Sequence, residues 1–289
     1  MLYTIAMAVT ITKEDGQQES FDPSKLHFTL GKAGASKSVQ DEIIAHIEKE
    51  LKEGMTTHEI YRHAFELLRK EHRPAAARYS MRRAVLSLGP TGFPFETFVG
   101  EIFKARGYEV HTDQILQGAC VEHEVDMVAR KEGECIAAEL KFHNSLSIKS
   151  DVQVALYVHA RFEDLRAGSA KEKKFCIDKG MLVTNTKFTH KAIQYGACKG
   201  LLIIGWNFPH EGNLHDLIEE TRAHPVTALT TLNNHEKAAL LEQRIVLCRT
   251  LSERHDILTS IGLHASKVEE VLEEIAGLSG GMARVEYGR

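Results

Sequence analysis

The sequence of 289 residues lacks several features that mark specialised classes of protein. Its five cysteines are an odd number, lie far apart and include no C-x-x-C pair, which argues against a disulfide framework and a structural zinc site. No apolar run approaches the roughly 18 residues that span a bilayer, and residues 1–9 lack the basic and apolar regions of a signal peptide. We therefore expect a cytoplasmic protein without a membrane partner.

The sequence also lacks an excess of positive charge. It contains 36 lysines and arginines against 40 aspartates and glutamates, a net charge of −4, and 43% of its residues are hydrophobic. This composition is typical of globular domains and excludes a disordered tail, a collagen and a uniformly basic nucleic-acid coat. Because residues 201–289 carry 8 basic and 13 acidic side chains, the negative charge is concentrated there. Binding to DNA would therefore depend on local charge elsewhere in the chain.

Proline is scarce, and two of the six prolines fall in residues 89–94, where they would interrupt a helix. We place a domain boundary there. Before it, an alternating stretch that returns toward Phe21 predicts a small hairpin, and Asp22 before Pro23 is typical of a helix start. Four helices are expected, at residues 23–34, 41–52, 57–71 and 74–88.

After the boundary, helical and strand patterns alternate, which is typical of an α/β domain. Strands are expected at residues 108–112, 124–130, 135–142, 181–185 and 201–206, and helices at 95–106, 151–165 and 189–199. The last part of the chain is helical, at residues 234–251, 254–260 and 266–276. We therefore predict a multidomain chain of α+β and α/β class, with domains at residues 1–90, 91–225 and 226–289.

The most informative stretch runs from Asp126 to Lys141. If Glu132 and Gly133 form a two-residue hairpin turn, Asp126 lies directly opposite Glu139 on the neighbouring strand, and Lys141 points to the same face as Glu139. Two opposed carboxylates in a buried sheet repel each other unless a cation lies between them, and oxygen ligands suit Mg²⁺ or Mn²⁺. A longer loop at the turn would shift this pairing.

Other polar residues leave two interpretations open. Glu96 borders the apolar stripe of its helix and is a candidate for the same interior site, although the helix dipole also favours a carboxylate in the first turn. Glu101 is expected on the solvated face. His123 and His143 flank the strands and either touch metal or phosphate or are packing residues. The run Arg161–Lys174 is either a phosphate-contacting loop or a solvated charge run.

The order of Glu96, Asp126 and Glu139-x-Lys141 resembles the PD-(D/E)xK nuclease superfamily, nearest to Mrr-like restriction endonucleases and archaeal Holliday junction resolvases. The resemblance implies that Asp126 and Glu139 hold a metal ion and that Lys141 positions or polarises the attacking water. Glu96 takes the position of the acid on the first helix. One departure is Val125, which stands where many members have proline before the aspartate.

A second stretch supports the same resemblance. Residues 153–157 are similar to the Q-x-x-x-Y helix motif of RecB-type nucleases. Gln153 and Tyr157 stand one turn apart on one edge of the expected helix, so the resemblance implies that both reach substrate or water.

Residues 1–90 resemble the ATP-cone, a module of ribonucleotide reductases and of their transcriptional repressor. The similarity runs through residues 11–16, 19–25, 54–57 and 76–78. By position it implies nucleotide binding by Ile11, Lys13, Glu19, Lys25 and Thr57, with Ile11 packing on the base. Glu14 stands where the family usually has arginine, which puts a negative charge beside a polyphosphate and is expected to weaken nucleotide binding or change its preference.

These patterns together favour an Mg²⁺-dependent deoxyribonuclease that hydrolyses phosphodiester bonds in DNA and is regulated by ATP or dATP at the N-terminal domain. The resemblance to ATP-cone proteins further implies a homo-oligomer whose state changes with nucleotide. The alternative is a nucleotide-responsive DNA-binding regulator without catalysis. The helical C-terminal region resembles helix-hairpin-helix modules only weakly, and its negative charge favours packing or dimerisation over phosphate binding.

Overall fold

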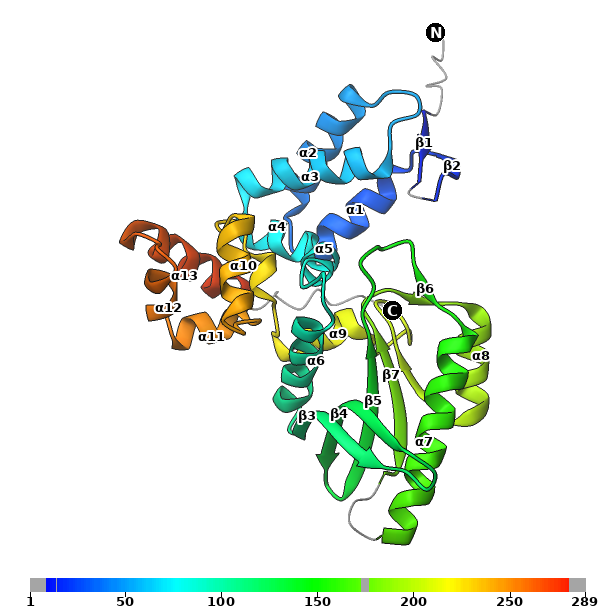
Figure 1. Cartoon of the computed structure of the whole chain (residues 1–289). Coiled ribbons are helices and arrows are strands. Elements are labelled where there is room, and N and C mark those ends of the chain that lie inside the picture. The colour runs from blue at the N-terminus through cyan, green and yellow to red at the C-terminus, as the bar shows by residue number, and fades with distance from the viewer. Residues whose placement is uncertain (1–8, 14, 173–176, 281–289) are drawn as a thin grey trace. The chain divides into compact units, whose positions relative to one another are not determined.

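The computed structural model describes residues 9–13, 15–172 and 177–280 (Figure 1). The chain divides into two compact units. Unit 1 contains the chain up to Met81, then Ala228–Leu232 and the residues from Ala265 onward, and unit 2 contains Arg82–Thr227 and Asn233–His264. The predicted multidomain α+β and α/β class is confirmed. The segment expected as one C-terminal helical region contributes to both units.

Unit 1 begins with the predicted hairpin, whose strands pair antiparallel, and continues with helices. The strands are β1 (Thr10–Thr12) and β2 (Gln18–Ser20), and the helices are α1 (Pro23–Lys32), α2 (Lys37–Glu50), α3 (Thr57–Glu71), α4 (Arg73–Tyr79) and α13 (Ala265–Ser279). Asp22 caps α1 as expected, because its side chain accepts a hydrogen bond from the Ser24 backbone N–H. Thr56 and Glu59 form a capping box at the start of α3.

The expected helix at 74–88 is wrong in its length. It is interrupted at Ser80, and the chain resumes a helix only at α5 (Met81–Leu86). The Ser80 hydroxyl donates a hydrogen bond to the Ala77 carbonyl at 3.0 Å, a local bond of the kind that competes with helix continuation.

Helix α13 belongs to unit 1 because it packs on α4. Arg78 of α4 donates hydrogen bonds to the Gly277 and Leu278 carbonyls at 2.9 and 3.0 Å, which satisfies backbone acceptors at the end of α13. The buried Glu274 accepts from the backbone and hydroxyl groups of Thr230 and Thr231. A buried carboxylate that accepts four hydrogen bonds is fully satisfied, and these bonds hold α13 to the segment around Thr230 and Thr231.

Unit 2 is built on a five-stranded sheet in the order β3-β4-β5-β7-β9. Its strands are β3 (Glu109–Gln117), β4 (Glu122–Lys131), β5 (Glu134–Lys141), β7 (Lys179–Thr184) and β9 (Leu202–Ile204). The first three are antiparallel neighbours, and β5, β7 and β9 are parallel. A separate pair of short strands is formed by β6 (Lys149–Ser150) and β8 (Lys187–Phe188).

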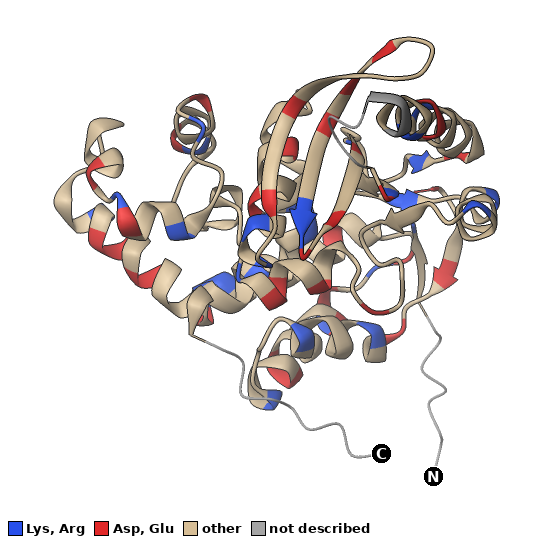
Figure 2. Ribbon diagram, turned by 90° about the horizontal axis from the view of Figure 1, so that it is seen from below, with Lys and Arg blue, Asp and Glu red and all other residues tan. Residues whose placement is uncertain are grey.

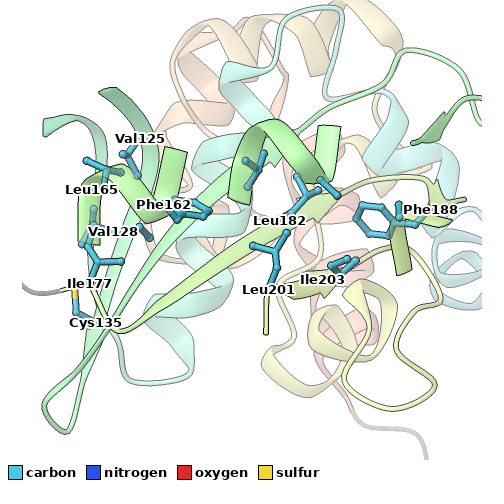
Figure 3. Close-up of a cluster of buried hydrophobic side chains, with 14 residues drawn as sticks. Val125, Val128, Cys135, Phe162, Leu165, Ile177, Leu182, Phe188, Leu201 and Ile203 are labelled. Atoms are coloured by element: carbon cyan, nitrogen blue, oxygen red, sulfur yellow. The ribbon is translucent and has the colours of Figure 1, made fainter. Parts of the chain in front are cut away.

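Helices cover both faces of this sheet. Helix α6 (Phe93–Ala105) lies on one face, and α7 (Val152–Glu172) and α8 (His190–Lys199) lie on the other (Figure 1). In the core on the second face, Phe162 and Leu165 of α7 pack toward Val128 and Leu182 of the sheet (Figure 3). Among the described residues, no helix is both long and apolar enough to cross a membrane.

The remaining elements of unit 2 agree with expectation only in part. They are α9 (Leu214–Thr221), the 3₁₀ turn Val226–Ala228 (which ends in unit 1), α10 (Asn234–Glu242), α11 (Cys248–Glu253) and α12 (Asp256–Ser260). Helix α9 was not expected. The expected helix at 234–251 is wrong, because Arg244 takes a left-handed conformation, with φ of 59°, and reverses the chain between α10 and α11.

The hairpin between β4 and β5 has the expected two-residue turn. Glu132 and Gly133 both have positive φ, 51° and 84°, as a type I′ turn requires. The register runs from Lys131 opposite Glu134 to Met127 opposite Ala138, so the strands follow the predicted register up to the pair that precedes Asp126 and Glu139.

Candidate functional site: a row of carboxylates across the sheet

The strand registers bring three acidic residues, Asp113, Asp126 and Glu139, to neighbouring positions on β3, β4 and β5. We call these three residues the carboxylate row. Asp126 and Glu139 follow directly after the pair Met127 and Ala138. On β3, the residues before and after Asp113 pair with Met127 and Val125 of β4, which places Asp113 beside Asp126. Figure 2 shows acidic segments on adjacent strands of this sheet and a basic segment at the end of one of them. The expected strand at 108–112 stopped short, so Asp113 was missed.

Asp126 and Glu139 are partly buried, and both pay an electrostatic penalty for ionisation. Burial raises the pKa of Asp126, against a hydrogen bond that its Oδ2 accepts from the Leu140 backbone N–H at 2.6 Å. Burial also raises the pKa of Glu139, and the Asp126 charge adds to the effect. Both carboxylates are therefore held in a place where a cation would be stabilising.

Glu96 joins this cluster from the first turn of α6. Burial, followed by the charges of Asp126, Asp113, Glu124 and Glu139, raises its pKa to about 7. The structure thus brings the sequence-predicted Glu96 into the electrostatic range of the row.

Glu101, by contrast, is not a simply solvated residue as expected. It forms ion pairs with Lys104 at 2.8 Å and Arg249 at 3.1 Å, since α11 lies close enough for Arg249 to reach α6. These partners lower the pKa of Glu101 against the opposing effect of burial.

Arg161 of α7 is the cation that the structure places at the row. It forms an ion pair with Glu139, donates to the Glu124 carbonyl at 3.0 Å and donates to the Tyr157 hydroxyl at 2.5 Å. Its guanidinium also lies 4.7 Å from the centre of the Tyr157 ring. The buried Nε has no hydrogen-bond partner among the described residues.

The sequence suggested that residues 161–174 form a phosphate-contacting loop or a solvated charge run, and the loop is wrong. Residues 152–172 form α7, and Arg161 lies against the sheet; Lys173 and Lys174 fall outside the described residues. The signal that was available is the spacing of Gln153, Tyr157 and Arg161, which recurs every four residues and places all three on one side of a helix.

The other predicted residues of this site occupy its exposed margin. Lys141 is exposed at the end of β5, and its charge lowers the pKa of Glu139. Gln153 is exposed near the start of α7, and Tyr157 is 59% exposed. The Tyr157 ring and the Gln153 amide are thus accessible to a ligand that reaches the row.

The two histidines considered as ligands have other partners. His123 Nε2 lies 2.8 Å from Asp164 Oδ2, and His143 Nε2 lies 2.9 Å from Ser150 Oγ. Asp164 has a pKa lowered to about 2, mainly by the hydrogen bond with His123. Neither pair places the imidazole nitrogen at the carboxylate row, which favours a structural role for both residues.

The donor set of the row fits a hard divalent cation. Half-buried carboxylate oxygens with raised pKa values favour a bound positive charge, and Mg²⁺ or Mn²⁺ prefers oxygen ligands. Asp126 and Glu139 are the carboxylates that would hold such an ion, since each directly follows the pair Met127 and Ala138 on neighbouring strands. Arg161 supplies part of the missing positive charge at Glu139.

A second cluster, which we call the lysine bridge, consists of Lys13, Glu19 and Lys25 in unit 1. Glu19 Oε2 lies 2.8 Å from Lys13 Nζ and 3.1 Å from Lys25 Nζ. The hydrogen bond with Lys13, followed by that with Lys25, lowers the pKa of Glu19. The hairpin and α1 thus bring together three of the five residues expected to bind nucleotide.

Of the other two, Ile11 lies in the hairpin itself and Thr57 lies at the start of α3. Ile11 of β1 is buried in the core, with 5% of its surface exposed. Thr57 is the first residue of α3, and the preceding Thr56 forms a parallel bridge with Thr12 of β1. Glu14, the departure from the ATP-cone pattern, lies outside the described residues.

In comparisons with known proteins, the lysine bridge and the carboxylate row fall in segments that match two different families. Family models match residues 9–85 as an ATP cone domain, 90–205 as a restriction endonuclease domain and 224–279 as an AF1548-like C-terminal domain. An uncharacterized protein of Archaeoglobus fulgidus is 33% identical over 177 residues, which is 61% of this chain and 97% of that protein. The chain belongs to the AF1548-like family.

Two solved structures resemble this AF1548-like protein. The crystal structure of AF1548, a protein of unknown function, aligns with a TM-score of 0.53 and 30% identity, over 66% of this chain and 100% of that chain. The MspJI restriction endonuclease in complex with a 27-mer oligonucleotide aligns with a TM-score of 0.32 and 15% identity, over 57% of this chain and 40% of that chain. The predicted ATP-cone and Mrr-like restriction endonuclease domains are confirmed. Their presence in one AF1548-like chain indicates a nuclease that carries a nucleotide-binding domain.

Proposed function

We propose that this protein is an Mg²⁺- or Mn²⁺-dependent DNA endonuclease whose activity responds to ATP or dATP. The observation that supports it most is the placement of Asp126 and Glu139 directly after the paired Met127 and Ala138 on adjacent strands. Both carboxylates have raised pKa values, and Lys141 lies at the end of β5, the strand that carries Glu139. This arrangement lies inside the segment that matches the restriction endonuclease family.

Each residue has a task that follows from its position. Asp126 and Glu139 hold the divalent ion, which when bound neutralises charge on the phosphate and lowers the pKa of water. Lys141, which carries positive charge beside Glu139, orients the attacking water. The Leu140 N–H fixes Asp126 through one oxygen and leaves the other oxygen for a ligand.

Residues of α6 and α7 complete the proposed site. Glu96, whose pKa lies near 7, exchanges a proton close to neutral pH and serves as a second acid beside the row. Tyr157 and Gln153 contact the DNA from the exposed side of α7. Arg161 directs its unpaired Nε to a phosphate oxygen once the divalent ion competes for Glu139.

The deciding experiment incubates the full chain with supercoiled plasmid and linear DNA, with Mg²⁺, Mn²⁺ or chelator. We expect cleavage only with a divalent ion, and at least about a hundredfold slower cleavage in Asp126→Asn. Glu134→Gln is the matched control, because Glu134 lies on the same strand as Glu139 but pairs with Lys179 at the surface. DNA binding without cleavage under every condition would instead support a regulator.

Regulation is tested separately with ATP and dATP. We propose that either nucleotide binds at the lysine bridge and changes the oligomeric state and, through it, the rate of cleavage. Light scattering after size-exclusion chromatography, with and without nucleotide, measures the first effect, and the cleavage rate measures the second. Calorimetry with Glu14→Arg shows whether the added positive charge strengthens binding. No heat of binding in either protein would contradict nucleotide regulation.

A further inference from the structure

Three metal-ligating side chains converge on the surface of unit 1. His46 and Glu50 lie one turn apart on α2, and His63 comes from α3. Glu50 Oε1 lies 3.4 Å from His46 Nε2, and Glu50 Oε2 lies 3.4 Å from His63 Nδ1. One potential ligand atom from each residue lies within 4.8 Å of the other two, so the three atoms can bind the same metal ion.

The backbones that carry these side chains are fixed by the core. Ile43 and Ile47 of α2 and Ile60 and Ala64 of α3 are buried in one hydrophobic cluster. The two imidazole rings meet edge to face, with their centres 5.1 Å apart. Packed helices hold side chains more precisely than loops do, so little rearrangement would bring the three groups into coordination.

Two other carboxylates near Glu50 already accept hydrogen bonds from the backbone or from a hydroxyl group. Glu50 lines an open cavity of about 580 Å³ together with Glu53 and Glu59. Glu53 accepts a hydrogen bond from the Thr10 N–H at 3.0 Å, and Glu59 accepts two from Thr56. Among the described residues, the ion pairs of Glu50 are with His46 and His63.

The chemistry of the three groups favours a metal ion over a pair of salt bridges. A neutral imidazole offers a lone pair that a metal ion can accept. Two imidazole nitrogens and one carboxylate oxygen are ligands that Zn²⁺, Co²⁺ and Ni²⁺ accept, whereas Mg²⁺ prefers oxygen alone. With bonds near 2.0–2.1 Å, tetrahedral ligand atoms lie about 3.4 Å apart. Each imidazole nitrogen lies 3.4 Å from one oxygen of the Glu50 carboxylate, which is close to this spacing.

We propose that His46, Glu50 and His63 bind one transition-metal ion of the Zn²⁺ class and thereby clamp α2 to α3. Three protein ligands leave a fourth position for water or for a small ligand from the adjoining cavity. This site is separate from the carboxylate row of unit 2, which consists of oxygen ligands, and it does not depend on the proposed nuclease activity.

The test is a titration of the full chain with Zn²⁺ by calorimetry and with Co²⁺ by visible absorption. Asp126→Asn serves as the parent protein, because it removes the metal-binding contribution of the carboxylate row. We expect one strongly bound ion, a Co²⁺ spectrum with nitrogen ligands, and a higher melting temperature with Zn²⁺ but not with Mg²⁺.

The variants His46→Gln, Glu50→Gln and His63→Gln decide the assignment. Each removes one ligand from a partly exposed position, so the fold is retained, as circular dichroism would verify. We expect each to weaken Zn²⁺ binding at least about tenfold and to change the Co²⁺ spectrum. His58→Gln, on the same helix α3 as His63, is the matched control and should bind Zn²⁺ as the parent does. Absent binding in the parent, or unchanged binding and spectra in all three variants, would overturn the proposal.

Discussion

The carboxylate row of unit 2 and the lysine bridge of unit 1 differ in which charge is missing. In the row, several acids face one another with Arg161 as a partial counter-charge, and the pKa values of Glu96, Asp126 and Glu139 are raised. In the bridge, one carboxylate lies between two lysines, and the pKa of Glu19 is lowered.

This difference indicates opposite ligands. The row lacks positive charge and is stabilised by a cation, whereas the bridge carries an excess lysine and attracts an anion such as a phosphate chain. Burial separates the two as well. The row is partly enclosed between sheet and helices, so its charges act strongly on each other. The side chains of Lys13 and Lys25 are 38% and 62% exposed, so water screens their charges more.

The largest expected effect comes from removing a charge that the row needs. Glu139→Gln should lower the rate of DNA cleavage by at least about a hundredfold, because it deletes a carboxylate proposed to hold the divalent ion. Single-turnover cleavage with saturating Mg²⁺ measures it, with Glu134→Gln as the control on the same strand. An equal rate in wild type and Glu139→Gln would end the distinction drawn between row and bridge.

Next in size is the loss of a lysine from the bridge. Lys13→Gln should weaken ATP binding about tenfold, since a charge-assisted hydrogen bond to phosphate is lost. Calorimetry compares it with Lys37→Gln, an exposed lysine at the start of α2. Equal affinities in the two variants would show that nucleotide binds elsewhere.

Arg161 tests whether the row is short of positive charge. In Arg161→Gln, Glu139 loses its ion pair, so added Mg²⁺ should raise the melting temperature by about 2–4 °C more than in wild type. Arg166→Gln is matched to it, because Arg166 lies on the same helix and pairs with the exposed Glu163. A smaller Mg²⁺ response in Arg161→Gln than in Arg166→Gln would contradict competition between Arg161 and the ion.

The smallest effect concerns pH. The pKa of Glu96 is raised from 4.5 to about 7 in the folded protein, so the folded state binds more protons than the unfolded state between these values. Stability from this group is present below about pH 4.5 and is lost as pH rises toward 7. Without metal, melting temperatures across this range should fall less steeply in Glu96→Gln. An unchanged slope would place Glu96 outside the influence of the row.

Local signals in the sequence predicted much of the fold. Asp22 before Pro23 predicted the start of α1, and Glu132-Gly133 predicted the turn and register of the β4–β5 hairpin. These features depend on backbone conformations of a few neighbouring residues, so a short stretch of sequence is enough. The break at Arg244 could not be predicted in this way, because arginine has no special preference for a left-handed conformation.

The candidate site was predictable in part for the same reason. Asp126 and Glu139 are opposed through a single hairpin, which the sequence encodes locally. Asp113 depends on a second hairpin with a longer connection, and Arg161 meets Glu139 from a helix 22 positions later in the chain. Such contacts require knowledge of how α7 packs on the sheet.

The sequence alone thus determined the hairpins, most helix starts, and the pairing of two carboxylates with a nearby lysine, because each follows from short-range geometry. Only the tertiary structure decided that Glu96, Asp113 and Arg161 join that pair, and that α13 belongs with α4. It likewise brought His63 to Glu50 across two helices. The physical reason is that burial and the electrostatic influence of one charge on another depend on distances in space, which packing of distant segments sets.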